Sequence, residues 1–481
     1  MKRIRLLPPA LLSFLLLGTA PPPPADTVLR HVTIIDVAAG RAVADQAVVL
    51  RGDSIVAVGP DARTARGWSA RTTIDGRGTF VMPGLWDMHV HFGGGPALAE
   101  ENKALLPLYI AHGITSVRDC AGDLAEEVLD WRDQIARGSL FGPTLYTSGP
   151  KIEGLKPLWK GTIEVGSRAQ VDAALTRLQR DRADFVKITD STLTPELFLY
   201  ALKAAKTRGM RTSGHIPMAL TVGQAVDAGI SSIEHLDYAF KPGVPDEGRV
   251  AADFAAGRID RDTANARLDA GFAPATARAA YVALAKRGVA VTPTLNISRT
   301  IAYLDREDHA RDPYLAYIGP GLRATYAWRV ERAARATPAQ VEARHAHFEK
   351  MARILPMLAR AGVPIMAGTD AGFLNSYDYP GIGLHDELGL YVRYGLTPAQ
   401  ALASATRTGP AWLGKAARYG GITPGKAADL LMLDRNPLTD IAATRAIRTV
   451  VLRGRVFDRA ALDAMLRDVQ VKVAAFPVPT A

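Results

Sequence analysis

Two histidines in the segment Asp87-Met88-His89-Val90-His91 have the spacing of a metal-binding pair. The surrounding apolar residues predict a β-strand, in which residues i and i+2 point to the same side, so His89 and His91 can bind one ion. His345 and His347 have the same spacing but fall in a predicted helix, where the two rings point about 200° apart. We therefore expect the first pair to bind metal and the second pair to be surface residues.

Further ligand types stand at the ends of other predicted strands. These residues are Lys187, His215, His235 and Asp370. Taken singly, each has a structural alternative, such as a buried histidine with satisfied hydrogen bonds or an aspartate that caps the next helix. Their accumulation at several strand ends instead predicts a metal centre built from histidine and carboxylate. The single Cys in 481 residues excludes a cysteine-based zinc or iron–sulfur site.

The elements that must position these residues alternate between strand and helix. Short apolar runs predict eight strands, at residues 85–90, 114–118, 144–148, 185–188, 211–215, 231–236, 289–294 and 364–368. Helical stretches separate them, and Thr194-Pro195 and Thr397-Pro398 are typical helix starts. Eight such units predict an α/β fold, a (β/α)8 TIM barrel with its chemistry at the carboxyl ends of the strands.

Strand-like runs also flank the predicted barrel at both ends of the chain. They lie at residues 28–37, 47–50 and 54–58, and again at 429–433 and 449–452. The turns between them predict antiparallel pairing. We expect residues 26–80 and 415–470 to form one small β-sandwich domain beside a barrel spanning 81–414. The long connections 239–287 and 296–361 look helical, and they either cover the barrel mouth or simply elaborate its packing.

The first 25 residues differ in character from the rest. Lys2, Arg3 and Arg5 precede an apolar run, and a proline-rich segment follows. This pattern is typical of a secretory signal peptide, with Ala20 and Ala25 as candidate cleavage residues. The alternative is a membrane anchor, but the run is shorter than the ~20 residues that a spanning helix needs. We expect a periplasmic or secreted protein with no stable membrane association.

Composition and charge narrow the class of protein. With 48% apolar and 22% charged residues, the chain has the material for a large core, which excludes disorder and coiled coil. The 58 Lys and Arg against 48 Asp and Glu give a formal net charge of +10, but no basic block of five residues occurs. Nucleic-acid binding is therefore not expected. The sequence leaves open whether the chain forms a homo-oligomer.

The chain resembles the amidohydrolase superfamily, whose metal-dependent hydrolases share a barrel and a flanking β-domain. The matching segments are Val81-Met82-Pro83-Gly84-Leu85-Trp86-Asp87-Met88-His89-Val90-His91 and residues 113–119, 233–235, 367–370 and 421–430. They extend over nearly the whole chain after the N-terminal segment. Below the superfamily level, the chain is most similar to Xaa-Pro and Xaa-Arg/Lys dipeptidases and to imidazolonepropionase-like hydrolases.

The resemblance implies a role for each candidate ligand. His89 and His91 bind a buried ion, His215 and His235 a more exposed one, and Lys187 bridges the two after N6-carboxylation. An unmodified lysine is a cation at neutral pH and a poor ligand, whereas its carbamate is an anion; the alternative is a mononuclear enzyme with an ordinary salt-bridged lysine. Asp370 binds the buried ion and serves as general base and then general acid. The implied cofactors are two divalent metal ions, zinc by expectation, which activate a bridging hydroxide.

Two departures from the family pattern bear on the substrate. Deaminases of the superfamily carry a catalytic glutamate two positions after the fifth-strand histidine, but Pro217 stands there in this chain, which favours hydrolysis. The Gly-Gly-His segment that dipeptidase relatives carry after the third strand is also missing. The candidate substrate contacts in its place are Lys151, Lys156, Tyr238 and, for the rim of the site, His385.

These observations predict a hydrolase that cleaves amide or peptide bonds in dipeptides or N-acyl amino acids. One alternative is a lactone, carbamate or phosphoester hydrolase, since the same hydroxide attacks many carbonyl or phosphoryl centres. A periplasmic binding scaffold is the non-enzymatic alternative, but it predicts at least one missing ligand, and none is missing. Cys120, next to the second strand end, is expected to be a buried thiol that packs as a small apolar residue.

Overall fold

The computed structural model describes residues 24–479, so the predicted signal peptide lies outside the described residues except for its last two positions. Ala25, one of the two candidate cleavage residues, is buried and is the first residue of a strand. Among the described residues, no helix combines the length and apolar character that crossing a bilayer requires.

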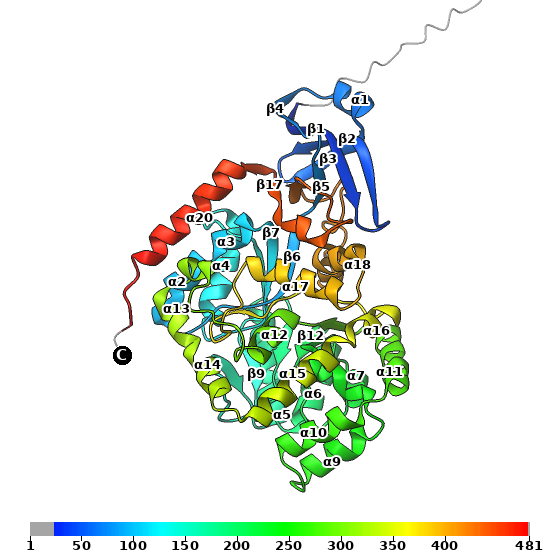
Figure 1. The fold of residues 1–481 in the computed structure, drawn as a ribbon, viewed down its shortest axis with the longest axis vertical. Coiled ribbons are helices and arrows are strands. Elements are labelled where there is room, and N and C mark those ends of the chain that lie inside the picture. The colour runs from blue at the N-terminus through cyan, green and yellow to red at the C-terminus, as the bar shows by residue number, and fades with distance from the viewer. Residues whose placement is uncertain (1–23, 480–481) are drawn as a thin grey trace, which may run out of the picture.

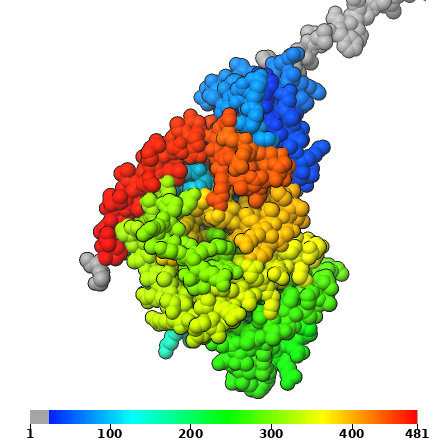
Figure 2. Space-filling model, in the orientation of Figure 1, coloured from blue at the N-terminus to red at the C-terminus, as the bar shows by residue number. Residues whose placement is uncertain are grey.

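Both chain ends contribute strands to one eight-stranded mixed sheet, which lies at the top of the molecule (Figure 1). Its strand order is β18-β17-β16-β5-β1-β2-β3, and β4 pairs with β1 beside this path. The strands are β1 (Ala25–Asp36), β2 (Arg41–Arg51), β3 (Ser54–Pro60), β4 (Ala70–Asp75), β5 (Phe80–Pro83), β16 (Leu430–Leu433), β17 (Ile447–Leu452) and β18 (Arg455–Asp458). The space-filling view shows the blue N-terminal and orange C-terminal residues side by side (Figure 2).

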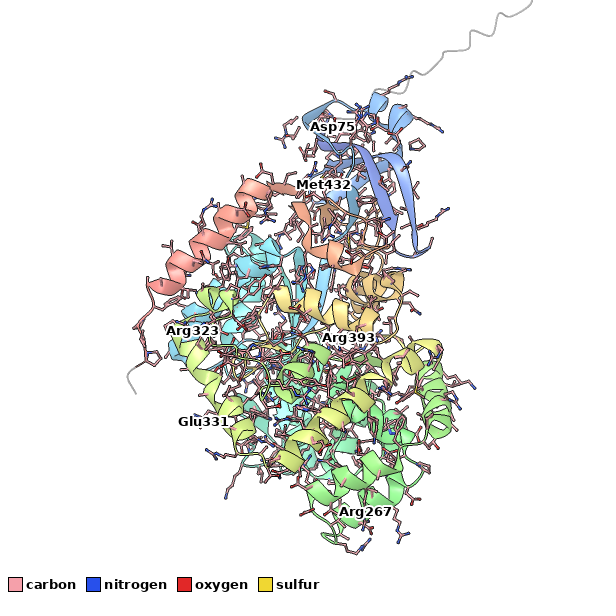
Figure 3. All side chains as sticks on the ribbon, viewed as in Figure 1. Asp75, Arg267, Arg323, Glu331, Arg393 and Met432 are labelled. Atoms are coloured by element: carbon pink, nitrogen blue, oxygen red, sulfur yellow. The ribbon has the colours of Figure 1, made fainter. Side chains whose placement is uncertain are left out.

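Strand β5 joins the two chain ends in this sheet. It pairs in parallel with β1 and antiparallel with β16, with Met82 opposite Leu431. Apolar residues from both ends form the core here, including Leu29, Val81 and Met432; Figure 3 labels Met432 within the upper domain. The second layer of the predicted β-sandwich stays a prediction.

The middle of the chain forms two parallel sheets, ordered β15-β6-β7-β8 and β10-β9-β11-β12-β13-β14. The strands are β6 (Leu85–His91), β7 (Ile114–Asp119), β8 (Thr144–Thr147), β9 (Lys151–Glu153), β10 (Thr162–Glu164), β11 (Val186–Ile188), β12 (Thr212–Gly214), β13 (Ser232–Glu234), β14 (Ala290–Thr292) and β15 (Ala371–Gly372). Seven of the eight predicted strands are confirmed, as β6, β7, β8, β11, β12, β13 and β14. Strands β9 (Lys-Ile-Glu) and β10 (Thr-Ile-Glu) were not predicted, because each has a single apolar residue between polar ones.

The eighth predicted strand, residues 364–368, is wrong as a regular strand. It holds one isolated parallel bridge, between Ile365 and Val291. The Met88 amide donates to the Ala367 carbonyl, which connects the segment to β6 as well. The Ala367 amide, however, donates to the carbonyl of Ser404, which lies in a helical segment and not in a strand. Residues 364–368 therefore connect β14 to β6 without continuous pairing to either strand.

Helices follow most of the parallel strands, as the sequence predicts. They are α2 (Ala99–Ala104), α3 (Leu106–Ala111), α4 (Ala125–Arg137), α5 (Arg168–Arg180), α6 (Pro195–Thr207), α7 (Val222–Ala228), α17 (Ile382–Arg393), α18 (Pro398–Ala403) and α19 (Gly409–Trp412). Thr194 caps α6 by accepting from the Leu197 amide, and Thr397 forms a capping box with Gln400 at α18. Both helix starts are therefore confirmed.

The two long connections are helical. The first contains α8 (Leu236–Phe240), α9 (Glu247–Ala255), α10 (Arg261–Gly271) and α11 (Pro274–Lys286), and the second contains α12 (Leu295–Ala302), α13 (Pro320–Thr325), α14 (Ala327–Ala334), α15 (Pro338–Ala352) and α16 (Leu355–Arg360). Helix α1 (Asp61–Thr64) lies in the upper sheet domain, and α20 (Arg459–Ala474) runs down one side of the molecule (Figure 1).

Candidate metal centre

His89 and His91 project from the end of β6 toward one carboxylate oxygen. His89 Nε2 lies 3.3 Å and His91 Nε2 2.8 Å from Asp370 Oδ1. The Nδ1 atom of each ring faces an acceptor, Glu234 Oε2 at 2.8 Å for His89 and the Ala121 carbonyl for His91. In a neutral ring the proton is therefore on Nδ1, and the Nε2 lone pair points at the carboxylate.

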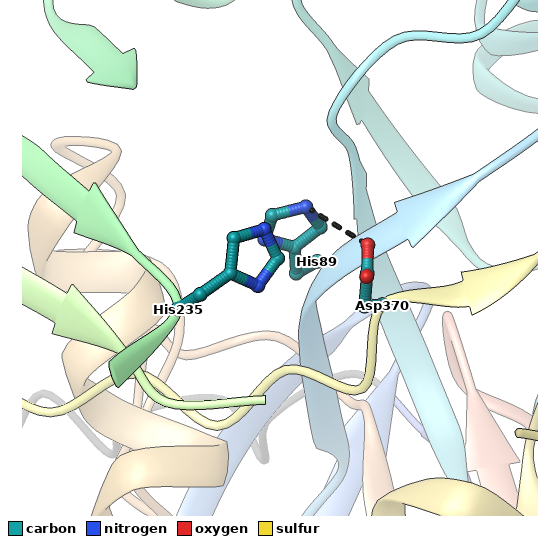
Figure 4. Close-up of side chains that lie close together, drawn as sticks. All are labelled: His89, His235 and Asp370. Carbon is teal, nitrogen blue, oxygen red and sulfur yellow. Dashed lines mark ion pairs between the residues drawn. The ribbon is translucent and has the colours of Figure 1, made fainter. Parts of the chain in front are cut away.

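A lone pair that faces a carboxylate oxygen needs a cation or a proton between them. His89 Nε2 is fully buried and forms no hydrogen bond, which is rare for a buried polar atom. Donor atoms of His89, His235 and Asp370 lie within 4.8 Å of one another, close enough to bind one ion. Figure 4 shows these three side chains and the His89–Asp370 pair. The residues present thus fit a divalent metal.

The remaining candidate ligands form a continuous chain beside this group. Lys187 Nζ lies 3.2 Å from His215 Nε2, and His215 Nε2 lies 3.0 Å from His235 Nε2. The rings of His235 and His89 are 5.0 Å apart between centroids, which links the two halves. His235 Nδ1 is hydrogen-bonded to the Thr294 hydroxyl at 2.7 Å. The structure therefore brings all six sequence-predicted ligands together at the carboxyl ends of β6, β11, β12 and β13 and in the segment before β15.

A left-handed backbone conformation orients two of these candidate ligands. His235 and Asp370 have φ values of 68° and 73°, in the left-handed region that residues other than glycine rarely adopt. Each turn is stabilised by a hydrogen bond to a neighbouring strand, from the His235 amide to the Thr292 carbonyl and from the Asp370 amide to the His89 carbonyl. Gly368 makes room for the second turn, because a Cβ there would approach the His89 amide nitrogen to 2.8 Å.

Electrostatics favour the ligand forms of these side chains. Burial and the positive charge of Lys187 hold the pKa of both His89 and His215 well below the usual range, which keeps the rings neutral. Burial also lowers the pKa of His235. For Asp370, burial raises the pKa, but the adjacent side chains of His91, His89 and His235 lower it further, so the carboxylate stays ionised.

A buried ion pair supports His89 from behind, and sequence reasoning missed it. Arg118 Nη2 donates to Glu234 Oε2 at 2.8 Å, and both side chains are fully buried. The Arg118 guanidinium packs over the rings of Phe185 and Trp412, at 5.0 and 4.8 Å from their centroids. The sequence signal for this pair was an arginine in one predicted apolar strand and a glutamate in another.

The hydroxyls of Ser213 and Ser232 complete this support, because they donate to Glu234 Oε1 at 2.7 and 2.6 Å. Burial raises the pKa of Glu234, but the charge of Arg118 and the hydrogen bond from His89 lower it further than burial raises it. Glu234 is therefore an anion that fixes the orientation and the proton of His89.

The candidate substrate contacts fall into two groups. Tyr238 stacks on His215, with ring centroids 5.2 Å apart, and its hydroxyl donates to Asp190. Lys151 is buried on β9, where burial and the charge of Lys187 lower its pKa to about 8. Both thus adjoin the metal-ligand candidates, whereas Lys156 is exposed on the loop that follows.

The structure does not bring His385 to this site, so its assignment to the rim is wrong. Its Nδ1 is hydrogen-bonded to Thr444 and its Nε2 to the His112 carbonyl, each at 2.9 Å. His112 directly precedes the start of β7, at the amino end of the strand and opposite the ligands. His385 therefore connects α17 to neighbouring segments within the core.

The second His-x-His pair does not chelate, but it is not a surface pair. His345 is buried and bonded to Asp305, while His347 is half-buried and lies 3.0 Å from both Asp237 and Asp269. The expectation of surface residues is corrected, because α15 packs against the neighbouring helices on that side. His347 connects α15 to Asp237 of α8 and Asp269 of α10, and His345 connects α15 to the turn after α12.

Cys120 is buried, as expected, and burial raises the pKa of its thiol to about 12. It lies close to His89 and Glu234. A protonated thiol is a poor metal ligand, and the Glu234 oxygens are already engaged by Arg118, His89 and two serines. Cys120 therefore packs as a small apolar residue.

Comparisons with known proteins identify the family of the chain and its fold. The chain is 23% identical to ochratoxinase of Aspergillus niger, and the alignment covers 87% of this chain and 84% of that protein. A crystal structure of a Xaa-Pro dipeptidase with bound methionine has a TM-score of 0.64 at 22% identity, covering 90% of this chain and 99% of the other. The bottromycin amidohydrolase structure has a TM-score of 0.71 at 22% identity, covering 94% and 92%. Residues 80–457 match the amidohydrolase family, and the chain belongs to that family.

Proposed function

We propose that this protein is a binuclear metal-dependent hydrolase that cleaves amide or peptide bonds in dipeptides or N-acyl amino acids. The observation that carries the proposal is the convergence of four histidines, a lysine and an aspartate, with the buried His89 Nε2 left without a hydrogen bond. Membership of the amidohydrolase family makes the protein a hydrolase acting on C–N bonds. The names of the dipeptidase and amidohydrolase relatives favour a peptide or amide substrate.

In this proposal, His89, His91 and Asp370 hold one divalent ion, and His215 and His235 hold the other. Zinc suits this set of nitrogen and oxygen donors. When bound, the metal pair supplies an activated water and polarises the substrate carbonyl.

In its N6-carboxylated form, Lys187 would contribute ligand oxygens to both ions. The side chain is almost completely buried, and the partner within hydrogen-bond distance is the imidazole of His215. A buried ammonium without a carboxylate partner is costly, and it repels a metal cation. Addition of carbon dioxide replaces that positive charge with a carbamate whose two oxygens are suitable ligands.

Asp370 moves the proton in the reaction. Its carboxylate is ionised and lies beside both His89 and His91. It accepts a proton as the attacking water adds to the carbonyl carbon, then gives that proton to the leaving nitrogen as the C–N bond breaks. One water is consumed, and the products are a carboxylate and an amine.

The wider architecture and the location of the protein belong to the same proposal. We propose that the two parallel sheets form one (β/α)8 barrel, supported by the backbone hydrogen bonds of residues 364–368 to β14 and β6 and by the fold of the relatives. We also propose export to the periplasm or the medium, on the basis of the N-terminal sequence. The proposed export is tested by fractionating cells and measuring in which fraction the protein lies and whether its mass has decreased by that of the N-terminal segment.

The function is tested by measuring amine release from a library of dipeptides and N-acyl amino acids. The protein is loaded with zinc and bicarbonate and compared with a Lys187→Ala variant. Turnover that disappears in the variant supports the proposal. No turnover across the library, with two metals still bound per chain, would contradict it and favour the lactone, carbamate or phosphoester alternative.

A further inference from the structure

An aromatic cleft opens beside the candidate metal centre. It has a volume of about 270 Å³, and its lining includes Trp159, Trp328, Phe373, Leu158, Lys160 and Asp123. The Trp159 and Trp328 rings meet edge to face, with centroids 5.7 Å apart. A cavity of ~150 Å³ already holds a benzene molecule, so this cleft has room for an aromatic ring.

The cleft lies at the same end of the strands as the metal ligands. Phe373 follows β15 directly, and its ring packs edge-on against His91, with centroids 6.5 Å apart. Trp159 lies on the loop after β9, and Trp328 lies on α14. The second long connection thus contributes one wall of the cleft, and Leu158 and Trp328 remain exposed at its mouth.

Lys151 adjoins both the cleft and the candidate metal ligands; the charges of Glu153, Asp119 and Asp123 act on its ammonium, but within residues 24–479 no carboxylate lies at ion-pair distance from it. The side chain is 7% exposed, and its ammonium lies over the Trp159 ring, 5.6 Å from the centroid. Within residues 24–479, neither an ion pair nor a hydrogen bond joins its Nζ to another side chain. Nearby Glu153 is fully engaged, because it accepts hydrogen bonds from residues 191–193. A buried ammonium of this kind is stabilised best by an anion.

We infer that the site selects amides that carry both a carboxylate and an aromatic group, with the carboxylate on Lys151 and the ring in the cleft that Trp159, Trp328 and Phe373 line. The inference rests on the proposed amide hydrolysis and specifies its substrate class. Aromatic rings favour offset or edge-to-face contacts of the kind these three side chains offer. Trp159 contacts both the Lys151 ammonium and the Trp328 ring. The proposed positions of the carboxylate and of the aromatic ring are therefore close together.

Equilibrium binding of product-like probes tests the inference without requiring turnover. The probes are 3-phenylpropionate, 3-phenylpropanamide and propionate, titrated calorimetrically into the metal-loaded protein. We expect 3-phenylpropionate to bind at least about tenfold more tightly than either of the others. Trp159→Ala and Trp328→Ala should each abolish the preference for 3-phenylpropionate over propionate. Lys151→Met should abolish the preference for 3-phenylpropionate over 3-phenylpropanamide.

Matched control variants separate these contacts from general damage. Leu155→Ala on the same loop and Lys203→Met on α6 change exposed residues that do not line the cleft, and they should keep both preferences. If the carboxylate preference survives in Lys151→Met, the metal centre binds the carboxylate and the assignment of Lys151 is wrong. If the ring preference survives in both tryptophan variants, the cleft assignment is wrong.

Hydrolysis of N-benzoyl-alanine and N-acetyl-phenylalanine, each against N-acetyl-alanine, separates the two proposals. A kcat/KM at least about tenfold higher for one aromatic substrate supports both. Turnover of all three at equal rates overturns the substrate class but keeps the proposed function. Tight, Lys151-dependent binding of 3-phenylpropionate without turnover of any amide supports the ligand class and overturns amide hydrolysis.

Discussion

His89 Nδ1 donates to Glu234 Oε2 at 2.8 Å, and neither side chain has any exposure to solvent. Glu234→Gln replaces this acceptor by a neutral amide, which also loses the charge that pairs with Arg118. Since such supporting groups raise the basicity of a ligand and fix its orientation, we expect metal affinity to fall roughly 10- to 100-fold. Competition with a chromophoric chelator measures it.

The control is Glu342→Gln, an exposed substitution on α15 that removes the same charge. It should leave metal affinity unchanged. Equal affinities of Glu234→Gln and the wild type would show that His89 does not depend on its buried partner.

Metal removal should lower both activity and stability. A ligand that binds only the folded state stabilises it by about 4 kcal/mol at a concentration 1,000-fold above Kd. We therefore expect a chelator to lower Tm and zinc with bicarbonate to restore it. Elemental analysis should give two metals per chain for the wild type and fewer for Lys187→Ala. A single metal per chain with Lys187 intact would contradict the binuclear site.

His347 should make stability depend on pH. Its hydrogen bond with Asp237 raises its pKa to about 9 against the opposing effect of burial, and Asp269 contributes as well. Because the folded pKa lies above the unfolded value near 6.5, the stabilisation is fully present below about pH 6.5 and is lost as pH rises through 9.

The matching variant is His347→Gln, compared with the wild type by urea denaturation at pH 6 and pH 10. The side chain is 37% exposed, so after allowance for solvent screening we expect a loss of about 1 kcal/mol at pH 6 and little at pH 10. Lys350 also pairs with Asp269 and keeps that carboxylate engaged in both proteins. An equal loss at both pH values would mean that charge is not the cause.

His385→Leu should affect stability without affecting metal content. It removes the hydrogen bonds to Thr444 and to the His112 carbonyl, and it leaves that carbonyl buried without its partner. The expected loss of unfolding free energy is about 1–3 kcal/mol. Thermal unfolding and elemental analysis measure the two effects. Loss of activity at unchanged stability would instead return His385 to the active site.

The convergence of the candidate ligands could be predicted from the sequence where local backbone geometry alone determines side-chain orientation. His89 and His91 lie two residues apart on one strand, so their convergence follows from strand periodicity. Lys187, His215 and His235 were predicted because each stands at the end of a short apolar run. Five of the six candidate ligands thus follow from strands that the structure contains, whereas Asp370 follows a segment that forms only an isolated bridge.

Features that depend on contacts distant in sequence were not predicted. Arg118 and Glu234 are 116 positions apart, and only the folded sheet shows that each compensates for the burial of the other. His385 stands in a helix whose inner face turns toward the amino ends of the strands, and residue spacing does not reveal that direction. Residues 364–368 resemble a strand in composition, but Ala367 donates to a helical segment instead.

The position of β5 in the upper sheet sets an order for synthesis. One of its edges pairs with β1, which leaves the ribosome early, and the other pairs with β16, made nearly 350 residues later. Until then, Val81 and Met82, which the finished protein buries completely, lie on an open strand edge of a nascent chain. Open apolar edges invite pairing with other chains. A chain that stops before Leu430 should therefore aggregate, and the last tenth of the protein acts as the closing step that makes the rest soluble.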